Sequence, residues 1–86
     1  MVEIKSVIFT AKFEREVRKV KDSSVRERLE KQIRKIAEDP GSGKPLRYGL
    51  KGEWIIRVKP YRLIYAVQED KLILLRFEHR KEVYDD

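Results

Sequence analysis

Two arginines stand inside the most strand-like stretch of a very polar chain, Leu50–Val67. Arg57 and Arg62 flank Pro60 in a run that is otherwise rich in β-branched and aromatic residues. A guanidinium binds phosphate or carboxylate through parallel charge-assisted hydrogen bonds. Two of them close together therefore suit an anionic ligand.

The alternation of side chains along a strand decides whether these arginines can meet. It places Trp54, Ile56 and Val58 on one face of a sheet and Arg57 and Lys59 on the other. If the following strand pairs as a hairpin about Pro60, its Arg62 lies on the arginine face. Like charges there repel, so an anion is one explanation for the cluster. The alternative is that each arginine is a solvated edge residue whose stem covers the core.

The rest of the chain predicts the elements that position this stretch. Apolar spacings of three and four predict helices, and β-prone runs bounded by Gly, Pro and Asp predict strands. Ser24 and Glu27 have the spacing of a capping box for the second helix. The expected elements are a strand in Val2–Phe9, helices over Ala11–Lys21 and Ser24–Glu38, a loop over Asp39–Pro45, and strands Leu46–Leu50, Glu53–Lys59, Tyr61–Val67 and Leu72–Phe77.

These elements predict an α+β fold in one domain, residues 1–86. The fold class is an N-terminal strand, a two-helix hairpin, and then a twisted antiparallel sheet of about four strands. The first strand joins that meander at one edge.

Composition narrows the kind of ligand. The chain has 86 residues, a net charge of +6, no cysteine and a single histidine. We therefore expect no disulfide, no metal site and no cofactor. There is no membrane-length apolar run, and a cytoplasmic location is expected. Lys44–Gln68 holds six Lys/Arg against one acid, or +5, which points to a polyanion or an acidic protein partner.

Two residues near the C-terminus add candidate chemistry. His79 can act as an acid or a base near neutral pH, although a lone histidine at a strand end is more often inert. Tyr84 would ordinarily pack the terminal segment onto the sheet. Taken alone, these residues support a binding face without establishing an enzyme.

Three patterns in this chain resemble the RelE/ParE-like toxins of prokaryotic toxin–antitoxin pairs. They are Pro45-Leu46 with Leu50-Lys51-Gly52, Trp54-Ile55-Ile56-Arg57-Val58 with Tyr61-Arg62-Leu63-Ile64-Tyr65, and His79-Arg80-Lys81-Glu82-Val83-Tyr84. The resemblance covers essentially the whole chain and implies a RelE-like fold.

The superfamily holds two activities. RelE-like members cleave mRNA in the ribosomal A site, whereas ParE-like members inhibit DNA gyrase. Arg80 and Tyr84 match residues typical of the RelE-like group. The resemblance thus implies a ribosome-dependent, metal-independent endoribonuclease acting through the RNA 2′-hydroxyl. The alternatives are a gyrase inhibitor and a catalytically inactive binding module.

The resemblance also assigns roles residue by residue. Arg57 matches a catalytic basic residue, Arg62 a phosphate-contacting arginine, Arg80 an arginine that stabilises the transition state, and Tyr84 a tyrosine at the scissile region. Ile55 stands where some relatives have a lysine proposed as the general base, so the proton acceptor stays open. The other expected site residues are His79 as an acid or base, and Lys51, Lys59, Trp54 and Lys81 as RNA or ribosome contacts.

The partners follow from the same resemblance. They are a cognate RelB-like antitoxin, the ribosome with its mRNA, and operator DNA bound by the hetero-oligomeric toxin–antitoxin complex. From the charge and apolar pattern of the chain, we expect its exposed basic groove and the edges of its apolar stripes to bind an acidic, amphipathic antitoxin helix. No membrane partner is expected.

Overall fold

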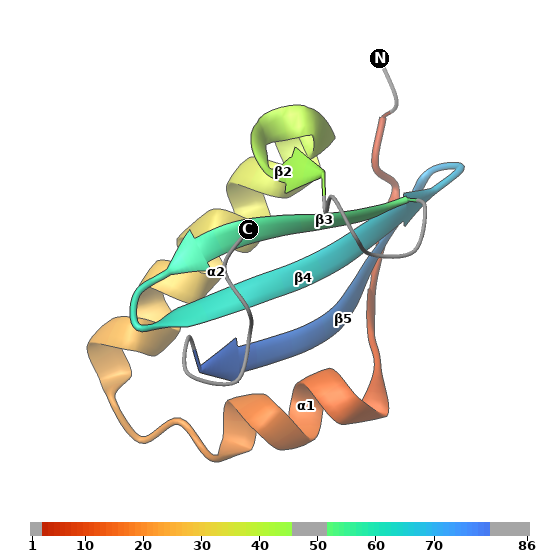
Figure 1. Ribbon diagram of the computed structural model, residues 1–86. Coiled ribbons are helices and arrows are strands. Elements are labelled where there is room, and N and C mark those ends of the chain that lie inside the picture. The colour runs from red at the N-terminus through yellow and green to blue at the C-terminus, as the bar shows by residue number, and fades with distance from the viewer. Residues whose placement is uncertain (1–2, 46–51, 80–86) are drawn as a thin grey trace.

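The computed structural model describes residues 3–45 and 52–79, and shows the predicted order of strand, helices and sheet (Figure 1). Within these ranges the elements are β1 (Ser6–Phe9), α1 (Ala11–Arg18), α2 (Ser23–Glu38), a 3₁₀ turn η1 (Pro40–Ser42), β2 (Lys44–Pro45), β3 (Glu53–Val58), β4 (Tyr61–Gln68) and β5 (Lys71–His79).

The strands form one sheet in the order β1-β5-β4-β3-β2. Neighbours from β5 to β2 are antiparallel, whereas β1 runs parallel to β5. The predicted meander with the first strand at one edge is therefore confirmed. Figure 1 shows α2 behind the sheet and α1 alongside β5. Both helices contribute to the core on the same face of the sheet.

The helix-side core follows the predicted apolar stripes. Phe13 and Leu29 are buried at 2% and 4% exposure, and Leu63 and Tyr65 of β4 are fully buried beneath them. Apolar residues at the helical spacing must share one face, which explains why both helices can pack on the same sheet. The buried cluster consists of Phe13, Val20, Val25, Leu29, Ile36, Val58, Leu63, Tyr65, Leu72, Leu74 and Phe77.

The start of α2 corrects one prediction. The N-cap is Asp22, whose carboxylate accepts hydrogen bonds from the Ser24 amide at 2.9 Å and from its hydroxyl at 2.7 Å. The predicted capping box of Ser24 and Glu27 is wrong. An ionised carboxylate is the stronger acceptor at the positive end of a helix, so the helix begins one residue earlier. The bond from the Ser24 hydroxyl lowers the pKa of Asp22.

The predicted loop after α2 is also more ordered than expected. Its residues form η1 and β2, and β2 pairs with Trp54 and Ile55 of β3. The hydroxyl of Tyr65 donates to the Pro40 carbonyl at 2.9 Å and accepts from the Gly43 amide at 3.1 Å. This buried tyrosine from β4 therefore fixes a segment that lacks apolar residues of its own. The strand predicted over Leu46–Leu50 lies outside the described residues.

An irregularity in β5 decides which side chains face away from the helices. Ile64 pairs with Arg76 but Tyr65 pairs with Leu74, so Leu75 is an extra residue, a β-bulge. Because of this extra residue, Leu74 and Phe77 both point to the helix side although they are three positions apart. Arg76 then points to the opposite side of the sheet, which we call the outer face.

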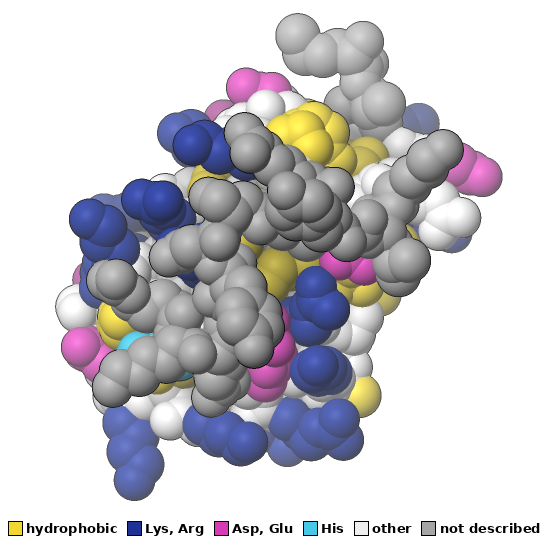
Figure 2. Space-filling model, viewed as in Figure 1, with side chains coloured by type: hydrophobic (Ala, Val, Ile, Leu, Met, Phe, Trp, Pro, Cys, Tyr) yellow, Lys and Arg dark blue, Asp and Glu magenta, His cyan; other side chains and the backbone are white. Residues whose placement is uncertain are grey.

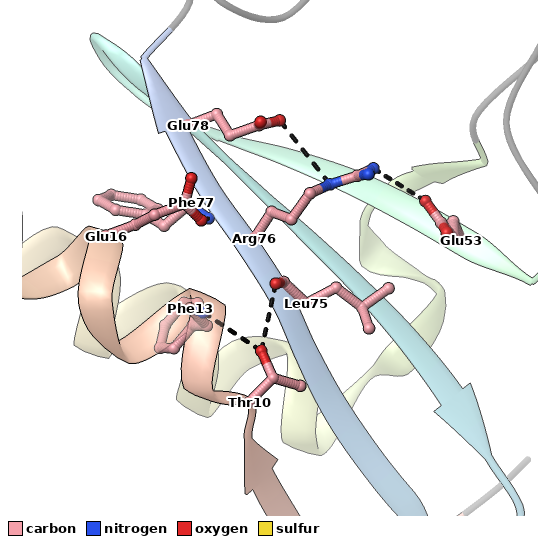
Figure 3. Close-up of polar contacts among 8 residues, drawn as sticks. All are labelled: Thr10, Phe13, Glu16, Glu53, Leu75, Arg76, Phe77 and Glu78. Carbon is pink, nitrogen blue, oxygen red and sulfur yellow. Dashed lines mark hydrogen bonds and ion pairs between the residues drawn. The ribbon is translucent and has the colours of Figure 1, made fainter.

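Side chains of α1 bind the edge of β5 around this bulge (Figure 3). The Thr10 hydroxyl, which caps α1, lies 2.8 Å from the Leu74 carbonyl oxygen and 3.2 Å from that of Leu75. Farther along, the Glu16 carboxylate accepts from the Phe77 amide at 2.9 Å. Where β1 has ended, helix side chains thus satisfy the backbone groups of β5.

Candidate functional site

Arg57 and Arg62 are direct cross-strand partners in the β3–β4 hairpin. Arg57 is exposed and Arg62 is half-buried, and both belong to the outer face. The hairpin geometry predicted from alternation is confirmed. Facing residues on paired strands have Cβ atoms about 5 Å apart, so the two arginine side chains leave the sheet from neighbouring positions.

The same row continues into β5 with a carboxylate. The cross-strand partner of Arg62 is Glu78. In the next row, Arg76 donates from Nη2 to Glu53 Oε1 at 3.0 Å, and its Nε lies 3.7 Å from Glu78 Oε1 (Figure 3). Arg76 is therefore held between two carboxylates on the outer face.

These contacts change the expected electrostatics of the face. The sequence interpretation described a cationic surface, yet Glu53 and Glu78 share it and neutralise Arg76 locally. Glu78 was missed as a site residue because the last strand was expected to end at Phe77, whereas Glu53 lies in the expected strand, in phase with Arg57, and was not considered as a site residue. A last strand that continues to His79 would have placed Glu78 opposite Arg62. The bulge at Leu75 is not visible in the sequence, so alternation counted from the start of β5 would still have assigned Glu78 to the wrong face.

Ile55 lies on the outer face beside the arginine pair. It is half-buried and pairs with Ile64, which is 1% exposed although it is not part of the helix-side cluster. An apolar side chain thus occupies the position that the resemblance associates with a lysine. It has no group that can accept or donate a proton.

Two of the expected site residues lie on the helix side instead. Trp54 is half-buried and stacks on Tyr65, with ring centroids 6.4 Å apart. The His79 ring meets the Tyr61 ring edge to face with centroids 5.2 Å apart, and Tyr61 stacks on Phe77 with centroids 4.8 Å apart. Alternation explains both placements, because these residues have the phase of the buried aromatics. The structure does not bring them onto the face that holds the arginine pair.

The remaining expected residues divide into two groups. Lys59 is exposed directly after β3, next to Arg57. Lys51, Arg80, Lys81 and Tyr84 lie outside the described residues. Over the described ranges, no three His, Asp or Glu side chains gather as a metal site would require, and no helix is long and apolar enough to cross a membrane.

Comparison with known proteins identifies the family. A family model described as the ParE toxin of type II toxin–antitoxin systems matches residues 7–84. The chain belongs to this toxin family. Comparison with curated protein sequences found no match.

Solved structures similar to this toxin include RelE proteins with and without their antitoxins. The RelBE2 toxin–antitoxin complex from Mycobacterium tuberculosis matches with 30% identity and a TM-score of 0.75, covering 93% of this chain and 94% of that one. A RelB–RelE complex from Methanococcus jannaschii has 25% identity and a TM-score of 0.74, over 91% and 95% of the two chains. The isolated Escherichia coli RelE toxin has 28% identity and a TM-score of 0.72, over 85% and 81%.

These matches confirm the expected RelE/ParE superfamily and the RelE-like α+β fold. The two comparisons point to different branches of the superfamily, because the family model is named for ParE and the similar structures include RelE toxins. The molecule is a toxin of a type II toxin–antitoxin system.

Proposed function

We propose that this toxin is a ribosome-dependent, metal-independent endoribonuclease that cleaves mRNA in the ribosomal A site. The observation that supports it most directly is the facing pair of Arg57 and Arg62 on the outer face. Similarity to the isolated RelE toxin of E. coli, with 28% identity, favours the RelE-like activity over the ParE-like one. Such cleavage would take place in the cytoplasm.

The reaction needs charge stabilisation more than it needs a metal. The ribose 2′-hydroxyl loses its proton and attacks the adjacent phosphorus, the bond to the 5′ oxygen breaks, and that oxygen takes up a proton. The products are a 2′,3′-cyclic phosphate and a 5′-hydroxyl end. Negative charge grows on the nonbridging oxygens during attack, and two facing guanidinium groups stabilise it. Arg57 and Arg62 have this role in the proposal, with Arg80 and Tyr84 completing the site.

Few side chains could accept the proton of the 2′-hydroxyl. Ile55 cannot serve, and His79 contacts Tyr61 on the helix side. Tyr84, Lys51 and Lys59 are the candidates that remain from the sequence, and Glu78 adds a carboxylate beside Arg62. A lysine ammonium or a tyrosine hydroxyl carries its proton at neutral pH and a carboxylate is a weak base, so alignment of the mRNA by the ribosome supplies much of the rate.

Cleavage on translating ribosomes tests the proposal. Purified toxin should cut mRNA at A-site codons, and Arg62→Ala or Arg57→Ala should lower the rate about a hundredfold or more, as loss of a preorganised charge donor does. Arg57→Lys separates charge from bidentate geometry. Lys71→Ala, an exposed change at the start of β5, is the matched control and should leave the rate unchanged. Intact mRNA with the wild type rules the activity out.

A gyrase inhibitor is the second candidate, because the matching family model is that of ParE. It predicts blocked supercoiling by purified gyrase with mRNA left intact. A third candidate, an inactive binding module, is suggested by the missing lysine at Ile55. It predicts that expression without antitoxin leaves growth unaffected.

In this proposal the antitoxin binds in a groove between the two helices. A groove of about 330 Å³ is lined by Phe9, Phe13, Glu14, Val17, Arg18, Arg26, Leu29, Glu30 and Ile33. Phe9 is 50% exposed at its margin, unusually high for a large apolar residue beside a core ring. The rim has two arginines and two glutamates, so apolar contact outweighs charge. An amphipathic antitoxin helix fits this chemistry.

Antitoxin binding measured by calorimetry tests this groove. Phe9→Ser should weaken binding by about tenfold or more, as loss of a buried aromatic anchor does. Phe9→Leu keeps the apolar surface and should retain most of the affinity. Unchanged affinity of the Phe9→Ser variant for the antitoxin would mean that the antitoxin binds another surface of the toxin.

A further inference from the structure

A pocket separate from the apolar groove lies where α2 meets the end of β3. Its volume is about 320 Å³, and it is lined by Arg28, Lys31, Gln32, Arg57, Val58 and Lys59. Four of these six residues are cationic and none is acidic. This contrasts with Arg76 on the outer face, which two carboxylates hold.

The pocket follows from the packing of one helix on one strand. Arg28, Lys31 and Gln32 share a face of α2, because residues three and four apart are neighbours on a helix. Buried Val58, 2% exposed, forms the floor, and Arg57 and Lys59 flank it in sequence. Figure 2 shows Lys and Arg side chains gathered at the left of the molecule, where α2 and the end of β3 lie in Figure 1.

Arg57 connects this pocket with the arginine pair. Within the described residues β2 pairs only with Trp54 and Ile55, and no described strand pairs with this edge of β3 at the level of Arg57. Arg57 both faces Arg62 across the hairpin and lines the pocket. A polyanion whose phosphate contacts the pair could therefore continue around this edge into the pocket.

Gln32 indicates what accompanies the anion. Its Oε1 is inaccessible to solvent and has no hydrogen-bond partner in the part of the chain that the structure describes, so a ligand reaches it only when the side chain turns into the pocket that Gln32 lines. A buried amide oxygen needs a donor, and an unsatisfied one is costly. Carboxylates and phosphates are acceptors and cannot satisfy it, whereas a ribose 2′-hydroxyl can donate.

We propose that this pocket binds a sugar–phosphate unit of RNA, with Arg28, Lys31 and Lys59 contacting the phosphate and Gln32 accepting from the ribose hydroxyl. The inference rests on the proposed function, which it extends from the cleavage site to a second RNA contact. The phosphate belongs either to the mRNA being cut or to ribosomal RNA, and both sources present the same chemistry. An acidic protein segment would have to satisfy Gln32 with a backbone amide or a hydroxyl side chain, and it is the alternative occupant that the test distinguishes.

The test removes the two helix charges, which lie outside the proposed catalytic residues. Arg28→Gln with Lys31→Gln keeps good helix formers on exposed positions. The control, Lys12→Gln with Arg15→Gln, removes equal charge from exposed positions of α1. Affinity is measured by fluorescence anisotropy for a short labelled single-stranded RNA, and by co-sedimentation for ribosomes free of mRNA.

The pocket variant should bind about five- to thirtyfold more weakly, as expected for two lost charge-assisted contacts, and the control within about twofold of wild type. On the single-stranded RNA its salt dependence should fall by about 1.4 in slope, or 0.7 per lost phosphate contact. Weaker binding to the short RNA assigns the phosphate to mRNA; weaker binding to ribosomes alone assigns it to ribosomal RNA.

Gln32→Leu tests the proposed ribose contact separately from the charged contacts, because it leaves the charge of the pocket unchanged. It should reduce the preference for RNA over DNA of the same sequence, because only RNA carries the 2′-hydroxyl. The proposal is overturned if the pocket variant matches the control on both probes, or if only binding of the cognate antitoxin weakens. Wild-type toxin that binds RNA but leaves A-site codons intact would refute the proposed function and leave the pocket standing.

Discussion

The hydroxyl of Thr10 lies 2.8 Å from the carbonyl oxygen of Leu74, across 64 positions of sequence. The Thr10 hydroxyl oxygen also accepts a hydrogen bond from the Phe13 amide at 3.2 Å, as the N-cap of α1. One side chain thus starts a helix and binds the strand beside the bulge. The bulge directs Arg76 and Glu78 to the outer face, so this contact bears on the composition of the candidate site.

Thr10→Val should lower the free energy of unfolding by about 1–2 kcal/mol, because it removes the cap and the bond to β5 while keeping the shape. Chemical denaturation monitored by circular dichroism measures the loss. Thr10→Ser retains the hydroxyl and should lose less than half as much. Equal losses for the two variants would mean that the hydroxyl contributes no more to stability than the methyl group that Thr10→Ser removes.

Gly43→Ala should destabilise the protein by about 1–3 kcal/mol, as overpacking does. A Cβ at Gly43 would lie 2.5 Å from the Tyr65 hydroxyl oxygen and 2.9 Å from the Ile55 carbonyl oxygen. Gly41→Ala is the control, since the nearest atom to its Cβ would be 3.7 Å away. Thermal unfolding compares them, and a Gly43→Ala midpoint equal to that of the control contradicts the close approach.

Tyr65→Phe should cost about 1–2 kcal/mol at neutral pH, because the Pro40 carbonyl and the Gly43 amide lose their shared partner. The effect should also depend on pH. Burial, with a smaller contribution from Asp39, raises the pKa of Tyr65 above 10.0.

The unfolded chain therefore releases the Tyr65 proton at lower pH than the folded one. This contribution to stability is fully present below pH 10.0 and is lost as pH rises through the folded pKa. Unfolding measured between neutral and alkaline pH should show a shallower alkaline decline for Tyr65→Phe. Parallel curves for the two proteins would mean that Tyr65 does not titrate differently on folding.

Arg76→Met should destabilise the toxin by about 1 kcal/mol, a modest value because the arginine side chain is 34% exposed. The methionine keeps the packing of the stem but leaves Glu53 and Glu78 without their shared cation. In a Glu53→Gln background the same change should cost less, and the double-mutant cycle gives the coupling. Additive losses across the cycle would mean that the 3.0 Å contact contributes no net stability.

Much of the fold could be predicted because it depends on local periodicity. The apolar stripe of α2 and the alternation from Trp54 to Val58 each require one face to be buried, and both are found as expected. The facing of Arg57 and Arg62 follows from the same alternation and a short turn. These features need only the spacing of residues along one or two neighbouring elements.

The features that could not be predicted depend on residues far apart in sequence or on competition between similar ones. Asp22 caps α2 in place of Ser24 because its carboxylate is the stronger acceptor, a choice that the capping-box spacing does not express. At the bulge, the Leu75 carbonyl lies 3.2 Å from the hydroxyl of Thr10, 65 positions away. Without it, alternation from Leu74 would have assigned Arg76 to the buried face.

The parallel pairing of β1 with β5 has a consequence for how this toxin is made. The partner of β1 is the last described strand, so Val7 and Leu72 must be joined before the helix-side core can close. Until β5 has left the ribosome exit tunnel, β1, α1 and α2 lack the strand on which they converge. Such long-range closure is slow to form. We therefore expect the toxin to complete its fold only once β5 is available to pair with β1.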